Sequence, residues 1–570
     1  MIPFNLNFNE DHSMKSKPTI SLTLGALLFS GPMMATEFHA GTAQELQTSL
    51  SLAASNGEDD TVFLAAGIYN GNFTFNTSEA QSLTIKAETN ALPGQIVLDG
   101  QQAGTVLNLN AGTMAANLTV EGITVKNGRG NPAGGLVVRT SGSLNLRRSV
   151  LRDSSSISWN NYAGNLSVIG PSAAIVSESE ISGGVNTMTD SSINATTVRL
   201  EQNSIKGNFG ALSINGKSIL LSANQVSGYG DYGGISCSAY DYPVGGNCIV
   251  SNNVFQRNSV GDRSPIYVYS DGTASFVNNL VYQNTNTYYH GSGVVHVSGK
   301  SVVCQGNTFQ DNQTQGIGGG AYLSAGNSLL CANNLVISNT AFRNETGYGG
   351  GGLTISSAAT NWIMNNTIYG NSAPNGGGLY LGTGGDSSTS RNYVHNNIIW
   401  GNTASANGPD VYVVSGGALR SLYNNNYHGM AGLWDVALNN IDVAPLFVNA
   451  LRGDYHLRAN SLCLNSGNNA APGLPVIDKD GNARIGNGVV DMGCYEHDST
   501  DKHPADVNNN WVITSQEFTN YAKAWTTNGA WATGPNPIPM DYVTRAGFLF
   551  QTNSGTYQNL GGGKPLNWKP

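Results

Sequence analysis

A run of oxygen-bearing residues near the C-terminus has the spacing of a cation-binding loop. Ca²⁺ takes oxygen ligands from positions one, three, five, seven and twelve of such a loop. In DVNNNWVITSQE these positions hold Asp506, Asn508, Asn510, Val512 (through its carbonyl) and Glu517. Trp511 occupies position six, where glycine normally makes the sharp turn, and no second loop of this kind follows. The spacing predicts a calcium site, with a loop that binds metal weakly or not at all as the alternative.

Three residues in the middle of the chain could support acid–base chemistry. His296 is the candidate Brønsted base for taking a proton from a uronic acid, and Lys300 or Arg343 would neutralise the substrate carboxylate. The sequence offers no aspartate cluster to hold calcium beside them, and no pair of acids at matching repeat positions indicates a glycosidase. A lone histidine on an exposed strand is more often an ordinary surface residue. Whether the chain is an enzyme is therefore left open.

Short strands that follow glycine-rich turns place one residue each on a common outer face. Because strand residues alternate between faces, aligning LSI, ISC, IYV, VHV, AYL, LTI, LYL and VYV puts the middle residue outward. These middle residues are Ser213, Ser236, Tyr267, His296, Tyr322, Thr354, Tyr380 and Tyr412. Sugars could stack on its aromatic members and bind their polar tips, which predicts a carbohydrate-binding set of Tyr267, His296, Tyr322, Tyr380 and Tyr412.

The competing interpretation of this column is structural. Tyrosine is a good strand former, and neighbouring rings on a half-exposed surface stabilise one another. A second outward aromatic set, Tyr282, Tyr369 and Trp400, lies on another face and favours this interpretation, because it shows that aromatic residues are used freely.

An asparagine-centred motif recurs and specifies the fold that positions these residues. It reads NNVFQRN, NNLVYQN, GNTFQDN, NNLVISN, NNTIYGN and NNIIWGN, with its second asparagine at Asn253, Asn279, Asn307, Asn334, Asn366 and Asn397. A step of 26 to 32 residues without helical apolar spacing predicts one solenoid coil per repeat. Asparagines five residues later predict a second stacked ladder, whose amides link the coils and satisfy the turn backbone: Asn258, Asn284, Asn312, Asn339, Asn371 and Asn402.

Apolar residues at fixed offsets from the repeated asparagine predict the core. Two residues after it stand Phe255, Val281, Phe309, Val336, Ile368 and Ile399, and three before it stand Val250, Phe276, Cys304, Cys331, Ile363 and Val394. Cys304 and Cys331 should therefore lie on adjacent coils roughly 4.8 Å apart, within the Cα range of a disulfide.

The six cysteines fall into three sequential pairs. These are Cys237 with Cys248, Cys304 with Cys331, and Cys463 with Cys494. Disulfides within the pairs are the simplest of the connectivities open to six cysteines, and a reduced, stacked Cys304–Cys331 pair is the alternative.

Composition and the N-terminus favour an exported all-β protein. Charged residues make up 11% of the chain, 72 residues are Gly and the net charge is −9, so no cationic cluster supports nucleic-acid binding. Lys15 and Lys17 precede a short apolar run that ends in small residues near Ala35. This is the layout of a secretory signal peptide, with Met14 as its natural start and a membrane anchor as the alternative. We expect a secreted or cell-surface protein.

The repeats and both ends of the chain resemble a known superfamily. The NNTIYGN turns and stretches such as GIGGGAYLSAG resemble the right-handed parallel β-helix proteins of the pectate-lyase-like superfamily, and DDTVFLAAGIYNGNFTF is similar to their first coils. The ending APLFVNALRGDYHLRANSLCLNSG resembles the closing segment of bacterial surface "choice-of-anchor" proteins, with Asn465 where an aspartate is common. The loop at Asp506 resembles the calcium loop of dockerin modules. The superfamily contains lyases, glycosidases and non-enzymatic adhesins, so the resemblance implies the fold and leaves activity open.

We therefore expect an all-β chain, a right-handed single-stranded parallel β-helix followed by a small α-rich C-terminal module. The expected division is a signal peptide over 1–35, an N-terminal cap over 36–60, the β-helix over 61–440, its closing segment over 441–497 and an EF-hand or dockerin-like module over 498–570. The predicted function is binding of polysaccharide or cell-surface glycans through the exposed aromatic face, with a surface or protein anchor in the C-terminal module. The alternative is a polysaccharide lyase or glycoside hydrolase acting on acidic polysaccharide.

Overall fold

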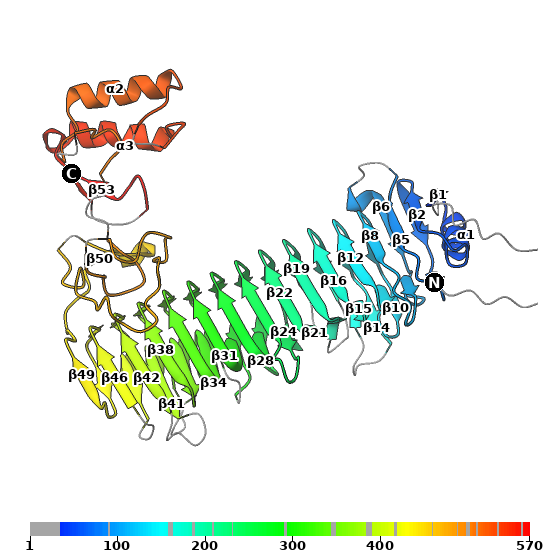
Figure 1. Cartoon of the computed structure of the whole chain (residues 1–570), viewed down its shortest axis with the longest axis horizontal. Helices are drawn as coiled ribbons and strands as arrows, with labels where there is room; N and C mark the ends of the chain where they lie inside the picture. Colours follow the sequence, from blue (N-terminus) through cyan, green and yellow to red (C-terminus); the bar gives the residue numbers. More distant parts are fainter. Residues whose placement is uncertain are drawn as a thin grey trace, which may run out of the picture.

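The structure is a computed structural model that describes residues 35–88, 92–157, 163–184, 189–207, 210–230, 232–289, 293–343, 349–383, 390–414, 419–458, 460–486, 488–497, 502–508, 511–532, 535–559 and 563–570. Over these residues the chain is a parallel β-solenoid of about 13 turns with three short helices, and the solenoid is the long rod of Figure 1. The predicted fold class is confirmed. Residues 1–34 of the expected signal peptide lie outside the described part. Within that part, no helix is long and apolar enough to cross a membrane.

One coil shows the repeating order of the strands. Around Asn253, β25 (Asn247–Ser251) is followed by β26 (Val254–Gln256), β27 (Ser259–Val260) and β28 (Ile266–Val277). Each strand pairs in parallel with its counterpart on the next coil. Because β28 pairs with β24 (Tyr232–Ala239) over its first part and with β25 over its second, two faces of the solenoid join in one 27-stranded sheet.

Stacked coils build the other faces from short strands. A 14-stranded sheet includes β26, β29 (Leu280–Tyr282), β32 (Thr308–Gln310), β35 (Leu335–Ile337), β39 (Thr367–Tyr369) and β43 (Ile398–Trp400). A six-stranded sheet consists of β27, β30 (Thr285–Asn286), β33 (Gln313–Thr314), β36 (Thr340–Ala341), β40 (Ser372–Asn375) and β44 (Thr403–Asn407).

The solenoid interior is filled by the two predicted apolar stacks. All twelve of the predicted core positions are buried, from Val250 and Phe255 to Val394 and Ile399. Phe276 stacks between Phe255 and Phe309 on the neighbouring coils, with ring centroids 6.0 Å apart on each side. Stacked side chains of this kind give each coil the same apolar contact with its neighbours, so burial of apolar surface stabilises the whole rod.

Both predicted asparagine ladders are present and share one bonding scheme. The backbone N–H and the Nδ2 amide of Asn253 both donate to Oδ1 of Asn279, at 2.9 and 3.0 Å. The Nδ2 amide of Asn253 also donates to the carbonyl of Leu221 on the preceding coil. The second ladder repeats the scheme from Asn258 to Asn284, at 3.1 and 2.8 Å. The buried turn backbone is thus satisfied without water, as buried polar groups require.

A short helix closes the N-terminal end of the rod. β1 (Thr36–Ala40) pairs in parallel with β2 (Asp60–Leu64), and α1 (Ala43–Ala53) lies between them in the chain. Thr42 caps α1 by accepting the N–H of Glu45 at 3.2 Å. Leu46 and Leu50 are fully buried in the solenoid core, so α1 covers apolar residues that the first coil would otherwise expose.

The closing segment folds back along the outside of the last coils. It contains β50 (Phe447–Asn449) and β51 (Asp454–Leu457), which pair antiparallel and lie beside the rod in Figure 1. Asparagines that precede the ladder residues hold it: Nδ2 of Asn333 donates to the Ile477 carbonyl, and Nδ2 of Asn365 to the Asp491 carbonyl. The segment covers Tyr369 and Trp400, which pack against its apolar residues. These two members of the second outward aromatic set therefore seat the closing segment and do not form an open surface.

The C-terminal module has a core of its own. Helices α2 (Ser515–Thr526) and α3 (Met540–Gln551) pack around Ile513, Tyr521 and Leu549, and lie beyond the closing segment in Figure 1. A buried contact joins the two parts, in which a ring nitrogen of His497 lies 3.1 Å from the carbonyl of Asn559.

The six cysteines are buried free thiols in the structure, so none of the three expected disulfides is formed in it. Cys304 and Cys331 do occupy the same position on adjacent coils, as predicted. Their sulfurs accept side-chain amides, of Asn307 at 3.5 Å and of Asn334 at 3.4 Å. The hydrogen bond with the Cys331 thiol, together with burial, raises the pKa of Cys304 well above its usual value, so Cys304 is a core residue rather than a reactive thiol.

Candidate functional site

The predicted outward column is continuous over eight coils. It runs along β21 (Gly210–Gly216), β24, β28, β31 (Val295–Gln305), β34 (Ala321–Ala332), β37 (Leu353–Ser357), β41 (Leu379–Thr383) and β45 (Val411–Val413). Strand register pairs, in order, Ser213, Ser236, Tyr267, His296, Tyr322, Thr354, Tyr380 and Tyr412. This set is called the outer column below.

The outer column is not equally open along its length. Tyr267, His296, Tyr322 and Tyr412 are half-buried, whereas Thr354 is 1% and Tyr380 is 4% exposed. The glycine-rich segment from Gly349 covers the last two: Thr354 donates to the Gly349 carbonyl at 2.7 Å, and a Cβ on Gly349 would lie 2.7 Å from the Tyr380 ring. The expectation that Tyr380 is an exposed rung is therefore wrong, because the loop of the preceding coil folds over it.

His296 lies between two tyrosine rings in the open part of the column. Its ring centroid is 5.0 Å from that of Tyr267 and 4.9 Å from that of Tyr322, and both contacts are edge-to-face. Burial lowers the pKa of His296 to about 4. The imidazole is therefore neutral at physiological pH, when it can accept or donate a hydrogen bond but offers no cation to an acidic ligand.

Further tyrosines flank the open part of the column. Tyr269 lies two residues beyond Tyr267 on the same strand, and its ring centroid is 5.2 Å from that of Tyr240. Tyr240 and Tyr242 are 54% and 93% exposed, and Tyr288 and Tyr289 follow β30 on exposed positions. These residues fall outside the repeat positions from which the column was predicted, because four of them lie in loops and Tyr269 lies in the neighbouring outward row. The clustered motifs YDYP and TYYH were the available signal.

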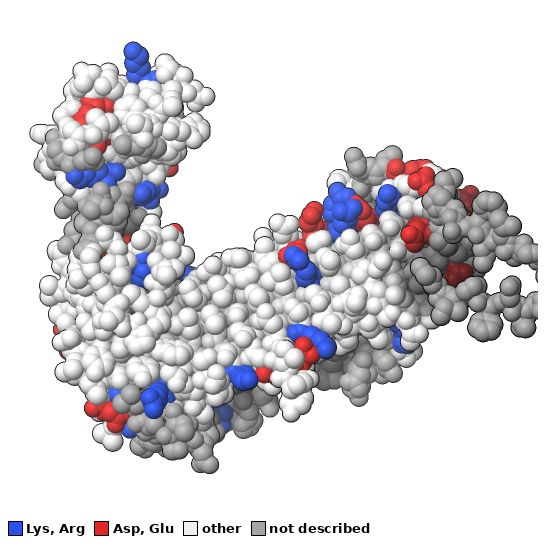
Figure 2. All heavy atoms as spheres, in the orientation of Figure 1, with Lys and Arg blue, Asp and Glu red and all other residues white. Residues whose placement is uncertain are grey.

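The surface around the open column is polar and nearly neutral. The next outward row pairs Ser238, Tyr269, Ser298 and Ser324 on successive strands. Charged residues nearby are paired with each other, Lys217 with Asp241 at 2.8 Å and Arg263 with Asp262 at 2.9 Å. In the view of Figure 2 the middle of the rod is mostly white, and blue and red atoms gather along its lower edge and toward its ends. The face offers rings and hydroxyls rather than a cationic field.

Neither of the two cations predicted to bind the substrate carboxylate, Lys300 and Arg343, lies beside His296. Lys300 is exposed and comes four residues later on β31, so strand rise puts its Cα roughly 13 Å from that of His296. Arg343 is 8% exposed, and its guanidinium lies 5.4 Å from the Tyr289 ring centroid. A single sugar at His296 would therefore not reach Lys300, and Arg343 is engaged with an aromatic ring.

The predicted calcium loop has the expected turn and a tight internal hydrogen-bond network. Trp511 adopts φ +67°, the left-handed conformation for which glycine is normally used at position six. One oxygen of Asp506 accepts the Trp511 N–H and the Tyr557 hydroxyl, both at 2.8 Å. One oxygen of Glu517 accepts the backbone N–H of Thr514 at 2.9 Å and so caps α2. Its other oxygen accepts the backbone N–H of Asn508 at 3.4 Å.

These contacts bear on whether the loop fits Ca²⁺. Asp506, Asn508 and Glu517 lie within one segment of 12 residues, as in a calcium loop, but the Asp506 and Glu517 carboxylates accept hydrogen bonds from the backbone of the same segment. Asn510 lies outside the described residues. Within the described part, no group of three or more His, Cys, Asp or Glu side chains is arranged to hold a metal. The loop fits calcium in its oxygen donors and turn, and any ion would compete with the Glu517 cap.

No family model and no curated protein matches this chain. Several solved structures resemble it, and two of them show how low the identity is. One is a mannuronic acid-specific polysaccharide family 6 lyase from human gut microbiota, at 14% identity and TM-score 0.36, covering 74% of this chain and 93% of that one. The other is the A-module of a mannuronan C-5 epimerase of Azotobacter vinelandii, at 13% identity and TM-score 0.32, covering 71% of this chain and 95% of that one.

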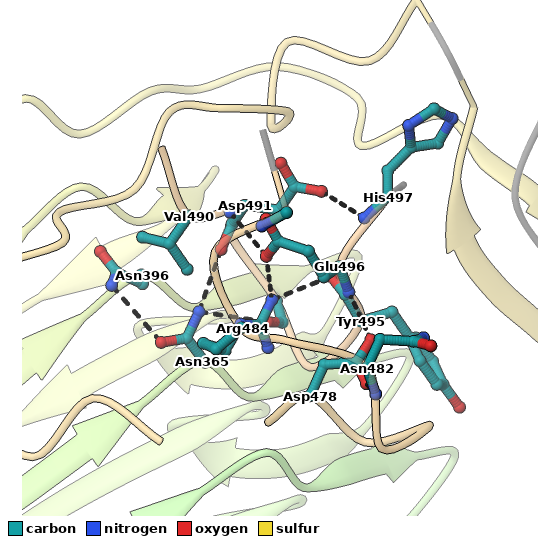
Figure 3. Close-up of polar contacts among 12 residues, drawn as sticks. Asn365, Asn396, Asp478, Asn482, Arg484, Val490, Asp491, Tyr495, Glu496 and His497 are labelled. Carbon is teal, nitrogen blue, oxygen red and sulfur yellow. Dashed lines mark hydrogen bonds and ion pairs between the residues drawn. The ribbon is translucent and has the colours of Figure 1, made fainter. Parts of the chain in front are cut away.

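The strongest concentration of perturbed ionisable groups lies in the closing segment (Figure 3). Arg484 and Glu496 form an ion pair at 2.9 Å with both side chains 1% exposed, and Arg484 also donates to Oδ1 of Asn333 on the solenoid at 3.3 Å. Burial, together with the charge of Asp491, raises the pKa of Glu496 to about 7. Burial raises the pKa of Asp491 to about 6.

This cluster is structural rather than catalytic. The Asp491 carboxylate accepts the backbone N–H groups of Asn465 and His497, both at 2.6 Å, and Glu496 accepts those of Gly486 and Asp491, both at 3.1 Å. Structural ion-pair networks shift pKa values as active sites do. Because the paired side chains are almost fully buried, no substrate reaches them, and they hold the closing segment in shape.

Proposed function

We propose that this is a secreted or cell-surface protein that binds polysaccharide through the open part of the outer column. The observation that carries the proposal is the uninterrupted run of Tyr267, His296 and Tyr322 on three adjacent coils, half-buried and next to a row of hydroxyls. Aromatic rings with polar tips bind sugars by stacking on C–H faces and hydrogen-bonding hydroxyls.

The geometry also suits a chain-like ligand. Successive rungs of a parallel sheet stand roughly 4.8 Å apart, which is close to the length of one sugar unit in an extended polysaccharide. Exposed Tyr240 adds to the aromatic surface through its contact with Tyr269, and exposed Tyr242, Tyr288 and Tyr289 lie on the loops that follow β24 and precede β31. A polysaccharide laid along the solenoid axis would meet a ring or hydroxyl at each unit.

A glycan array with the full-length protein tests the proposal. Binding to one or more polysaccharides should fall about two- to tenfold in Tyr322→Ala, since a stacked ring contributes roughly 0.5–1.5 kcal/mol beyond area burial. Tyr282→Ala is the matched control, because Tyr282 is a half-buried tyrosine of β29 on a different sheet. Equal binding by wild type and Tyr322→Ala would reject the column as the site.

A second candidate function is elimination or a related reaction on an acidic polysaccharide. One observation favours it: His296 is neutral at physiological pH and is flanked by two tyrosines, so a proton acceptor and two phenolic groups lie together. In this proposal His296 is the base that takes the proton next to the uronate carboxylate; Lys300 and Arg343, the cations predicted to neutralise that carboxylate, do not lie beside His296, so that role is not assigned. Elimination creates an ultraviolet-absorbing double bond. Loss of that signal in His296→Ala supports the proposal, and a silent wild type on a panel of uronate polysaccharides rejects it.

We further propose that the C-terminal module anchors the protein to a surface or partner and binds Ca²⁺. A groove of about 820 Å³ lies on α3 and the last residues, with exposed Met540, Phe548 and Leu566 and the cations Arg545 and Lys564 around it. Calcium would be held by Asp506, Asn508, Asn510, the carbonyl of Val512 and Glu517, and would brace the start of α2. A pull-down with the full-length protein and Phe548→Ala, with and without calcium, tests the anchor.

A further inference from the structure

We propose that the outer surface of the six-stranded sheet is a second glycan site, which takes an uncharged polysaccharide chain running along the solenoid axis. An open groove of about 470 Å³ lies on this surface, formed by β36, β40 and β44 of three adjacent coils. The proposal goes beyond the outer column, because the groove lies on another sheet and suits a different ligand. It shares with the proposed function only the general class of ligand.

A row of neutral hydrogen-bonding side chains runs along the whole sheet. Strand register places in one outward row, over six coils, Ser259, Thr285, Gln313, Thr340, Ser372 and Thr403. All six are exposed or half-buried, whereas the residue that follows each of them in the strand is buried on the first five coils, as at Asn286, Thr314 and Ala341, and half-buried at Ala404 of β44. Each hydroxyl both donates and accepts hydrogen bonds, and the Gln313 amide does the same with separate atoms. This matches the mixed donors and acceptors of sugar hydroxyls.

An apolar platform lies beside this row. Phe342 follows Thr340 by two residues and is 49% exposed, and Pro374 holds the equivalent place after Ser372. Together they line one side of the groove while Thr340, Ser372 and Thr403 line the other. A pyranose ring can therefore lay its C–H face on Phe342 and turn its hydroxyls to the polar row.

The repeat of the groove matches a polymer rather than a single sugar. Its rungs recur at the strand spacing of roughly 4.8 Å, about the length of one pyranose in an extended chain. Three coils line the groove itself, and the polar row continues for three more coils in the direction of β27. A chain of several sugars would thus meet one hydrogen-bonding side chain of the polar row at each unit, and the apolar platform at Phe342 and Pro374.

The charge of the groove selects against acidic polysaccharides. Its lining residues, Thr340 to Phe342, Ser372 to Pro374 and Thr403 to Ser405, are all uncharged. A uronate carboxylate placed there would lose water without gaining a cation, which costs free energy. The nearest cation in the sequence, Arg343, lies against the Tyr289 ring. The ligand class is therefore a neutral hexose or pentose polymer.

Isothermal titration calorimetry of the full-length protein with neutral hexasaccharides tests the proposal. The probes are cellohexaose, xylohexaose and mannohexaose, with an oligouronate hexamer as the charged comparison. At least one neutral probe should bind, with affinity reduced about tenfold or more by Phe342→Ala and abolished by Ser372→Trp, which fills the groove. Phe342→Tyr should bind like the wild type and shows that the fold tolerates change at this position. Leu280→Ala is the matched control, because Leu280 is a similarly exposed apolar residue of β29, which belongs to another sheet.

The outcomes separate the two glycan sites. Neutral binding that survives Tyr322→Ala but not Phe342→Ala supports the groove, whatever becomes of the outer column. Failure of every neutral probe to bind the wild type overturns the groove, as does binding that survives both Phe342→Ala and Ser372→Trp. Neither of these results contradicts the outer column, which is judged by Tyr322→Ala on the glycan array.

Discussion

Asn402 donates both its backbone N–H and its side-chain amide to one carboxylate oxygen of Asp410, at 3.1 and 2.9 Å. Each asparagine of the second ladder donates in the same direction, so the amide dipoles are aligned along the rod and end on this carboxylate. The other oxygen of Asp410 accepts the backbone N–H groups of His428 and Gly429. Asp410 therefore does for this ladder what an acidic residue does at the donor end of a helix dipole.

Replacing Asp410 should destabilise the end of the rod. Asp410→Ala leaves four donors without this acceptor, of which the two of Asn402 are buried, and Asp410→Asn turns its amide toward the donors of His428 and Gly429. Asp410 is 1% exposed, so we expect losses of roughly 2–4 kcal/mol for alanine and less for asparagine. Urea unfolding measures the loss, and Asp442→Asn is the control, because Asp442 is an exposed acid that pairs with the exposed side chain of His428. Equal stability of Asp410→Ala and wild type would contradict the capping role.

His456 gives the closing segment a dependence on alkaline pH. Its ring nitrogens lie 2.8 Å from Asp454 and 2.7 Å from Asp480. Burial alone would lower the pKa of His456, but the two carboxylates outweigh it and raise the pKa to about 9. Because the pKa is raised on folding, the stabilisation is fully present below about pH 6.5 and is lost as pH rises through about 9. It amounts to at most about 3 kcal/mol.

Comparison with a variant isolates this effect from other titrations. The difference in free energy of unfolding between wild type and His456→Gln should be largest at pH 6 and shrink toward pH 10. His39→Gln is the control, because His39 pairs with Glu88 on an exposed surface at the other end of the rod. A difference that does not change between pH 6 and pH 10 would show that the contacts of His456 with Asp454 and Asp480 do not couple stability to pH.

The asparagine ladders and the core were predictable, because their residues recur once per coil at fixed distances in sequence from the repeated asparagine. Exposure along the outer column was not. Strand alternation says that Tyr322 and Tyr380 both point outward, but whether a ring meets water depends on the loop of another coil, and only Tyr380 has the segment at Gly349 over it. The return of the closing segment was equally hidden, since the contact of Arg484 with Asn333 spans 151 residues and repeats nowhere.

Removing one partner of the buried Arg484–Glu496 pair should destabilise the protein more than replacing both partners with apolar residues. Arg484→Met leaves a buried carboxylate without its cation, which typically costs about 3–5 kcal/mol. The double variant Arg484→Met/Glu496→Leu removes both charges and should cost clearly less than the sum of the single changes. A double-mutant cycle by thermal unfolding measures the coupling. Additive losses would mean that the two side chains act independently.

Calcium binding should depend on Glu517 and respond to loop charge. Titration of the full-length protein should release heat with Ca²⁺, Glu517→Gln should abolish it, and Asn508→Asp should tighten binding because an added carboxylate strengthens a calcium loop. Gln516→Ala is the control, since Gln516 is an exposed neighbour on the same helix. If neither the wild type nor Asn508→Asp releases heat on titration with Ca²⁺, this module does not bind calcium.

Tyr322 and Tyr380 occupy the same column, but replacing Tyr322 should mainly lower glycan affinity, whereas replacing Tyr380 should mainly lower stability. Tyr380 is 4% exposed beneath the Gly349 segment, so Tyr380→Ala should cost about 3–5 kcal/mol of stability, as for other large buried aromatic residues. Tyr322 is half-buried, so Tyr322→Ala should cost markedly less stability and instead lower glycan affinity. Thermal unfolding and the glycan array on the same two preparations measure both effects. If Tyr322→Ala lowers stability as much as Tyr380→Ala and leaves binding unchanged, the aromatic rings serve the fold alone.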